Sequence, residues 1–158
     1  MLGPLRVGGL VVAVTLGVTA GGSLACPSSP AVEQRRQGVP VADADSEYDR
    51  GVRARVAQDW VAAAEAFHRA ITLRPAFADA WNELGFALRH QGRYPESLDA
   101  YGEALRLRPD FPEALEYLGE AYVKLKRLDD ARRVLERLRV LDAGRAAELA
   151  EEIRTATP

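Results

Sequence analysis

The sequence predicts an all-α fold made of stacked helix pairs followed by a capping helix. When the chain from residue 44 onward is compared with itself, a shift of 34 positions aligns Gly51, Gly85 and Gly119. Within each block of that length, apolar residues recur every three or four positions, which is the period of a helix with one buried face. A repeat of this length is typical of arrays in which each helix pair buries what its neighbour cannot cover alone.

The same shift aligns small, aromatic and aliphatic positions as well as the glycines. The aligned sets are Ala63, Ser97 and Ala131; Phe67, Tyr101 and Leu135; Ala70, Ala104 and Leu138; and Leu73, Leu107 and Leu141. Pro75 and Pro109 also align, whereas the third block has Ala143 there.

The middle block shows where its two helices begin and end. We expect the first helix to run from Asp79 to His90, with Gly92 supplying the positive φ that closes it. Pro95 opens the second helix, at a position where its missing N–H group does no harm. Pro109 then ends that helix.

Gly85 lies in the interior of a predicted helix, where glycine costs about 0.5 to 1 kcal/mol relative to alanine. It follows Leu84 on the face that packs against the second helix of the pair. We expect the missing side chain to let the second backbone approach closely near Ser97. Packing along that contact would then outweigh the loss of helix propensity.

This pattern resembles that of the tetratricopeptide repeat (TPR) family. The middle block matches the family motif with Trp81, Leu84, Gly85, Leu88, Ser97, Tyr101 and Pro109. The first block has Glu47 and Arg50 where the motif has tryptophan and leucine, and the third block lacks the last proline. The resemblance implies three repeats, over residues 44–77, 78–111 and 112–145, arranged as a right-handed superhelix.

Residues 146–158 are expected to form the capping helix and a short tail. Ala146, Leu149, Ala150 and Ile153 share one helical face, and charged residues occupy the remainder. An array needs such a polar-backed last element because its final repeat would otherwise expose apolar surface to water.

The resemblance also implies a concave groove, lined by the first helix of each repeat, that holds segments of partner proteins. Carried over position by position, the groove residues are Asp45, Tyr48, Val52 and Arg55; Asp79, Asn82, Phe86 and Arg89; and Glu113, Glu116, Glu120 and Val123. They comprise an acidic row, an apolar centre and a basic edge of two arginines, which would suit a peptide with apolar anchors flanked by positive charge. The charges have a structural interpretation too, because acids near helix starts and bases near helix ends complement the helix dipole.

Some TPR proteins bind the carboxylate terminus of chaperones through a clamp of lysine, arginine and asparagine side chains. The matching positions of this sequence hold Tyr48, Val52, Glu83, Glu113 and Tyr117. This set lacks the clamp and disfavours chaperone termini as partners.

The first 25 residues have the order of a secretory signal peptide. Arg6 precedes an uncharged run, from Val7 to Ala25, that is rich in valine, leucine, alanine and glycine. Residues 26–43 mix proline, serine, glycine and charges without apolar periodicity, which predicts a flexible linker.

The end of this segment leaves three interpretations. Leu24, Ala25 and Cys26 resemble a bacterial lipoprotein signal, which implies lipidation of Cys26 and a membrane anchor, although Ser23 replaces the usual leucine. Ser23 and Ala25 also form a cleavage site for ordinary signal peptidase, which would release a soluble exported protein. The third interpretation is an uncleaved membrane anchor.

Composition and motifs argue against several kinds of site. The net charge of −2 gives no overall basic field for nucleic acid, and one cysteine with two histidines leaves little for a metal site. No nucleophile and base are patterned as a catalytic set, so we expect no enzyme and no cofactor. The sequence predicts an adaptor at the bacterial cell envelope; a cytoplasmic adaptor or co-chaperone, or a regulatory subunit of an enzyme, are the alternatives.

Overall fold

The computed structural model describes residues 43–157, which form seven α-helices and no strand. The helices are α2 (Ala44–Val56), α3 (Trp60–Leu73), α4 (Ala78–His90), α5 (Tyr94–Leu107), α6 (Pro112–Lys124), α7 (Leu128–Leu141) and α8 (Ala143–Ala156). The predicted all-α fold class is confirmed. The predicted signal peptide, Cys26 and all of the linker except Asp43 lie outside the described residues.

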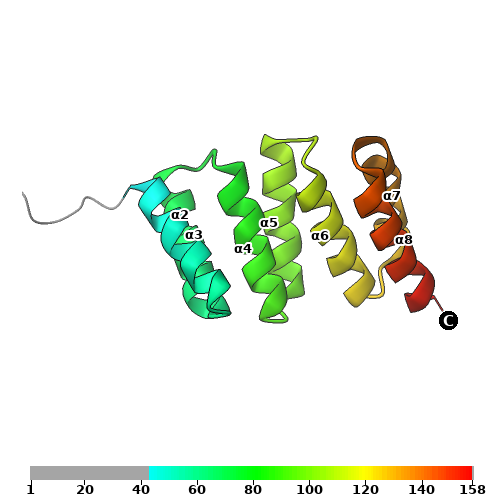
Figure 1. The fold of residues 1–158 in the computed structure, drawn as a ribbon, viewed down its shortest axis with the longest axis horizontal. Helices are drawn as coiled ribbons and strands as arrows, with labels where there is room; N and C mark the ends of the chain where they lie inside the picture. The colour runs from blue at the N-terminus through cyan, green and yellow to red at the C-terminus, as the bar shows by residue number, and fades with distance from the viewer. Residues whose placement is uncertain (1–42, 158) are drawn as a thin grey trace, which may run out of the picture. The chain divides into compact units, whose positions relative to one another are not determined.

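The helices pack as three hairpins, α2 with α3, α4 with α5, and α6 with α7. Neighbouring hairpins meet where α3 packs on α4 and α5 packs on α6, so the array grows in chain order along one direction (Figure 1). Helix α8 packs against both α6 and α7 and closes the C-terminal end. None of these seven helices has the length and apolar character that crossing a membrane requires.

Helix α8 begins at Ala143, three residues before the predicted start of the capping helix. Asp142 explains the difference, because its carboxylate accepts hydrogen bonds from the backbone N–H groups of Gly144 and Arg145, at 3.0 and 3.1 Å. Ala143 occupies the position where the first two repeats have a proline. The third repeat is therefore joined to α8 by one residue.

The loops inside the three hairpins share one backbone conformation. Gly92 has the expected positive φ, at 76°. Gln58 and Lys126, which stand 34 residues before and after it, have φ values of 59° and 60°. The loop geometry is thus kept even where an L-residue must adopt the left-handed conformation.

The aligned glycines of the first two repeats make room for aromatic rings. A Cβ atom added to Gly85 would lie 2.7 Å from a ring carbon of Tyr101, and one added to Gly51 would lie 2.5 Å from the ring of Phe67. Both rings are fully buried. The expected approach of a backbone near Ser97 is therefore wrong, since the ring of Tyr101 fills that space.

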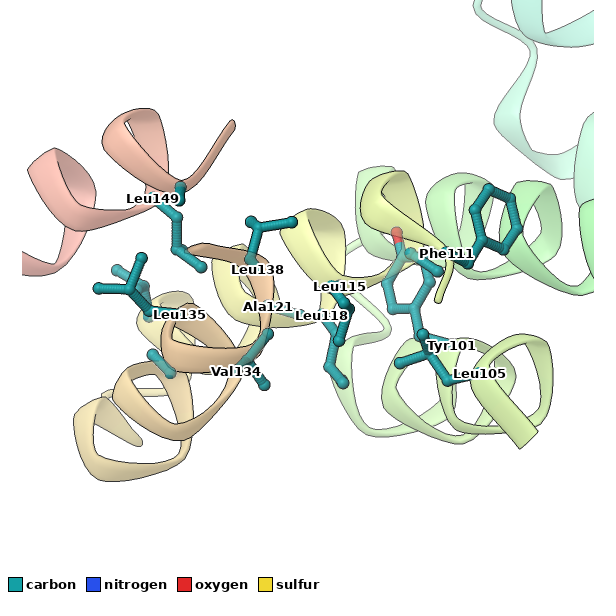
Figure 2. Close-up of a cluster of buried hydrophobic side chains, with 14 of the residues drawn as sticks. Tyr101, Leu105, Phe111, Leu115, Leu118, Ala121, Val134, Leu135, Leu138 and Leu149 are labelled. Carbon is teal, nitrogen blue, oxygen red and sulfur yellow. The ribbon is translucent and has the colours of Figure 1, made fainter. Parts of the chain in front are cut away.

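The third glycine meets a different element. The atoms nearest to a Cβ added to Gly119 belong to Leu149 of α8. The aromatic position of this repeat holds the shorter Leu135, and α8 supplies the side chain that packs over the glycine. Figure 2 shows this part of the core, in which Leu115, Leu138 and Leu149 are almost completely buried.

Candidate peptide groove

The predicted groove residues lie on α2, α4 and α6, and the structure brings those of neighbouring helices together. Tyr48 and Val52 are half-buried and pack partly against the core. Val123 is 6% exposed and belongs to the core, so its placement in the groove is wrong. Its side chain falls on the inner face of α6, one residue before the helix ends.

Phe86 is partly exposed and is the centre of an aromatic cluster. Its ring centroid lies 5.1 Å from that of Tyr117, 4.5 Å from His90 and 5.9 Å from Trp60. Trp60 and His90 stack at 4.2 Å with an interplanar angle of 15°. We call Trp60, Phe86, His90 and Tyr117 the aromatic surface. It joins residues of α3, α4 and α6, and so spans all three hairpins.

The arginines of the predicted basic edge lie beside this surface. The guanidinium groups of Arg55 and Arg89 are 5.8 and 5.3 Å from the centroid of Phe86, within cation–π range. Arg55 also pairs with Glu83 of the next hairpin at 3.2 Å, and Arg89 pairs with Glu120. The two charges are therefore neutralised inside the array, and the basic edge is not free to meet an acidic partner.

The predicted acidic row is also paired within the chain. Asp79 accepts two hydrogen bonds from Arg108, at 2.9 and 2.8 Å, and Asp45 pairs with Arg74. Each arginine stands 29 residues after its carboxylate, at the end of the second helix of the same repeat. These pairs support the structural interpretation of the row, because they tie the two ends of a hairpin together.

The third repeat departs from this pattern. Arg145 of α8 contacts Glu113 at 3.1 Å, Asp142 at 3.4 Å and also Glu116, so one guanidinium serves three carboxylates. Glu116 is 5% exposed. Burial raises its pKa, and Arg145 opposes the rise. Negative charge therefore exceeds positive charge at this point.

Burial likewise raises the pKa of two other groove carboxyl groups. Glu83 lies opposite Arg55 and Glu120 opposite Arg89, and in each case the arginine lowers the pKa again in part. Carboxylates held in this way are costly to desolvate and depend on their arginine partners.

A cleft of about 330 Å³ lies beside these groups. Its lining consists of Tyr48, Asp79, Asn82, Glu83, Arg108, Phe111 and Glu113. Asn82 is 4% exposed, and its amide oxygen has no hydrogen-bond partner among the described residues. Burial, with the nearby Glu83 and Asp79, raises the pKa of Tyr48 to about 12, so its phenol stays protonated. Nowhere in residues 43–157 do three histidine, cysteine or acidic side chains gather as a metal would require.

Sequence family models agree with this architecture. Two models described as tetratricopeptide repeat match residues 48–103 and 113–141, and one described as TPR repeat matches residues 87–126. The chain carries tetratricopeptide repeats. A comparison with curated proteins gave no match.

Solved structures of other proteins share the fold of this array. The TPR2B domain of yeast Sti1, solved as a complex with pHsp70, has a TM-score of 0.68 at 23% identity over 72% of this chain and 95% of that chain. The second TPR domain of human RPAP3, in complex with the HSP70 peptide SGPTIEEVD, has a TM-score of 0.67 at 25% identity over 70% and 94%. The MamA protein has a TM-score of 0.60 at 26% identity over 66% and 57%.

Three members of the aromatic surface were not predicted as groove residues from the sequence. Trp60 begins the second helix of the first repeat, and His90 ends the first helix of the second, so neither follows the spacing used for the groove. The sequence analysis considered Tyr117 only as a position that matches the chaperone clamp. Aromatic character near a hairpin loop was the one available signal for Trp60 and His90.

Proposed function

We propose that this TPR protein is a non-catalytic adaptor whose groove holds a segment of a partner protein through the aromatic surface. The supporting observation is that Phe86, half-exposed, joins Trp60, His90 and Tyr117 across three hairpins. Solvent-accessible aromatic side chains grouped in this way favour a binding site for apolar anchors of a partner.

The chaperone peptides bound by the neighbouring structures are poor candidates for this groove. The peptide SGPTIEEVD, solved with RPAP3, ends in acidic residues and a carboxylate. Glu83 and Glu113 stand at two of the clamp positions here, and both line the cleft. An acidic peptide end would meet like charges, so we propose a different class of partner.

Site-specific photocrosslinking tests the groove in cells of the source organism. A benzoylphenylalanine placed at Phe86 should give a distinct crosslinked product with a partner protein. The matched control carries the same group at Val140, which is 86% exposed on α7. If position 86 gives no product, or only the products of position 140, the groove is not the binding site.

We further propose that the protein is exported and held at the bacterial envelope by lipid on Cys26. The order of Arg6, the apolar run and the sequence Leu24-Ala25-Cys26 supports this. Attachment of several acyl chains would anchor it firmly, whereas one chain binds only marginally.

Labelling with radioactive fatty acid tests the anchor separately from the groove. The wild type should take up label, and Cys26→Ser should not. If the wild type takes up no label and reaches the envelope as a soluble protein, the lipid anchor is wrong while the adaptor proposal stands.

A further inference from the structure

We infer that the cleft lined by Tyr48, Asn82 and Glu113 is a subsite for one lysine or arginine side chain of the bound segment. The inference rests on the proposed function, since it names the chemistry of a partner held in the same groove. It also assigns a place to the positive charge that the sequence led us to expect on the bound peptide. Asp45 and Asp79 of the acidic row each pair with their own arginine, whereas Glu113, which lines this cleft, shares Arg145 with two other carboxylates.

The charge with the weakest compensation around the cleft is that of Glu113. Three carboxylates line the cleft, those of Asp79, Glu83 and Glu113, while Arg108 is the one cation among the described lining residues. Both hydrogen bonds of Arg108 go to Asp79, and Glu83 pairs with Arg55 from outside the lining. Glu113 has only a share of Arg145, which also contacts Glu116 and Asp142. A positive charge entering the cleft would compensate the excess.

The hydrogen bonds show a second shortage. Asn82 is almost fully buried and its amide oxygen has no partner among the described residues. This oxygen is an acceptor. An ammonium or guanidinium group carries several N–H donors and no acceptor, so it satisfies this oxygen and the charge together. A carboxylate would fail on both counts.

The walls of the cleft suit the stem of such a side chain. Tyr48 is half-buried with its ring packed on Phe77 at 4.9 Å, and Phe111 is 7% exposed. Lysine and arginine bury their methylene groups along apolar surface while the charged end makes polar contacts. The two aromatic residues provide that surface, and the acceptors provide the polar end.

Capped single-residue fragments test the subsite without knowledge of the partner. N-acetyl-lysine methylamide or N-acetyl-arginine methylamide is titrated into the labelled protein, and the NMR signals of the Asn82 side-chain amide are followed. We expect saturable shifts with a Kd in the millimolar range. N-acetyl-norleucine methylamide and N-acetyl-glutamate methylamide should give none, and sodium chloride at equal ionic strength controls for screening.

Variants show whether the cleft carboxylates are responsible. Glu83→Gln and Glu113→Gln should each weaken binding of the lysine fragment about threefold or more. Glu136→Gln, which removes an exposed carboxylate of α7, is the matched control and should leave binding unchanged. Circular dichroism confirms that each variant is folded.

Three results would overturn the subsite. They are the absence of saturable shifts with both cationic fragments, equal shifts with the norleucine fragment, or equal shifts with the glutamate fragment. A crosslink at Phe86 combined with any of these results would leave the adaptor proposal intact and remove the subsite alone.

Discussion

Gly85 and Gly102 both lie in helix interiors, yet their surroundings differ. A Cβ atom at Gly85 would meet the ring of Tyr101, which is fully buried and has no room to swing away. A Cβ atom at Gly102 would meet nothing within 4 Å. Glycine is therefore required at the first position by packing, and at the second it only lowers helix propensity.

Alanine at these two positions should have opposite effects. We expect Gly85→Ala to lower the free energy of unfolding by about 1 to 3 kcal/mol through overpacking. Gly102→Ala should raise it by up to about 1 kcal/mol, because alanine favours the helix. Urea denaturation of both variants and the wild type measures the difference. Equal effects of the two substitutions would show that the ring of Tyr101 does not require the glycine.

The imidazole of His90 should titrate below its ordinary range. Partial burial disfavours the cation, and the neighbouring Arg89 repels it, so the pKa is lowered from 6.5. The neutral ring favours the folded state. This contribution to stability is present above pH 6.5 and is lost as the pH falls through the pKa of the folded state. NMR titration of the ring, assigned with His90→Gln, checks the sign. A midpoint at or above 6.5 would contradict it.

Helix α8 completes the third repeat as well as covering its end. Leu149 is 1% exposed and packs over Gly119, in the place that an aromatic residue of the second helix takes in the first two repeats. The helix therefore supplies part of the core that the third repeat cannot form alone.

Truncation of Leu149 should accordingly be severe. We expect Leu149→Ala to cost about 2 to 5 kcal/mol of unfolding free energy. Val140→Ala removes apolar atoms from a residue of α7 that is 86% exposed, and it should change stability by less than about 0.5 kcal/mol. Thermal and urea unfolding measure both. A loss of similar size in the two variants would mean that α8 packs loosely.

Most helices could be predicted from the sequence because each repeat marks its own ends. Gly92 and Pro109 stand at the expected turns, and α4 begins one residue before the expected Asp79. The start of α8 could not be placed, since the cue there is a carboxylate cap in a position where the earlier repeats have proline. Only the folded loop shows that Asp142 caps the helix.

The candidate site was predictable only along single helices. Helical spacing put Phe86 and Arg89 on one face, and the structure places them in contact. It could not show that Arg89 meets Glu120, or that Trp60 stacks on His90, because such contacts depend on how separate hairpins pack. For the same reason the sequence left open which groove charges were already paired.

The free energy of local unfolding should differ between helices at the middle and at the ends of the array. Helices α3 to α7 each pack against at least two other helices, with α4 to α6 in the middle, whereas among the described residues α2 packs chiefly on α3 (Figure 1). Stability in repeat arrays is approximately a sum of repeat and interface contributions, so the middle should open last. Native-state hydrogen exchange should show the slowest amides in α4 to α6. Equal protection in α2 would instead indicate a single cooperative unit.

Two of the main contacts of the middle repeat lie within its own 34 residues. Gly85 meets Tyr101, and Asp79 binds Arg108. Arg55 and Arg89 are also one period apart, so Glu83 in a tandem copy would again find an arginine. A tandem duplication of residues 78–111 would therefore lengthen the scaffold while Asp79 and Glu83 of the added copy each keep an arginine partner.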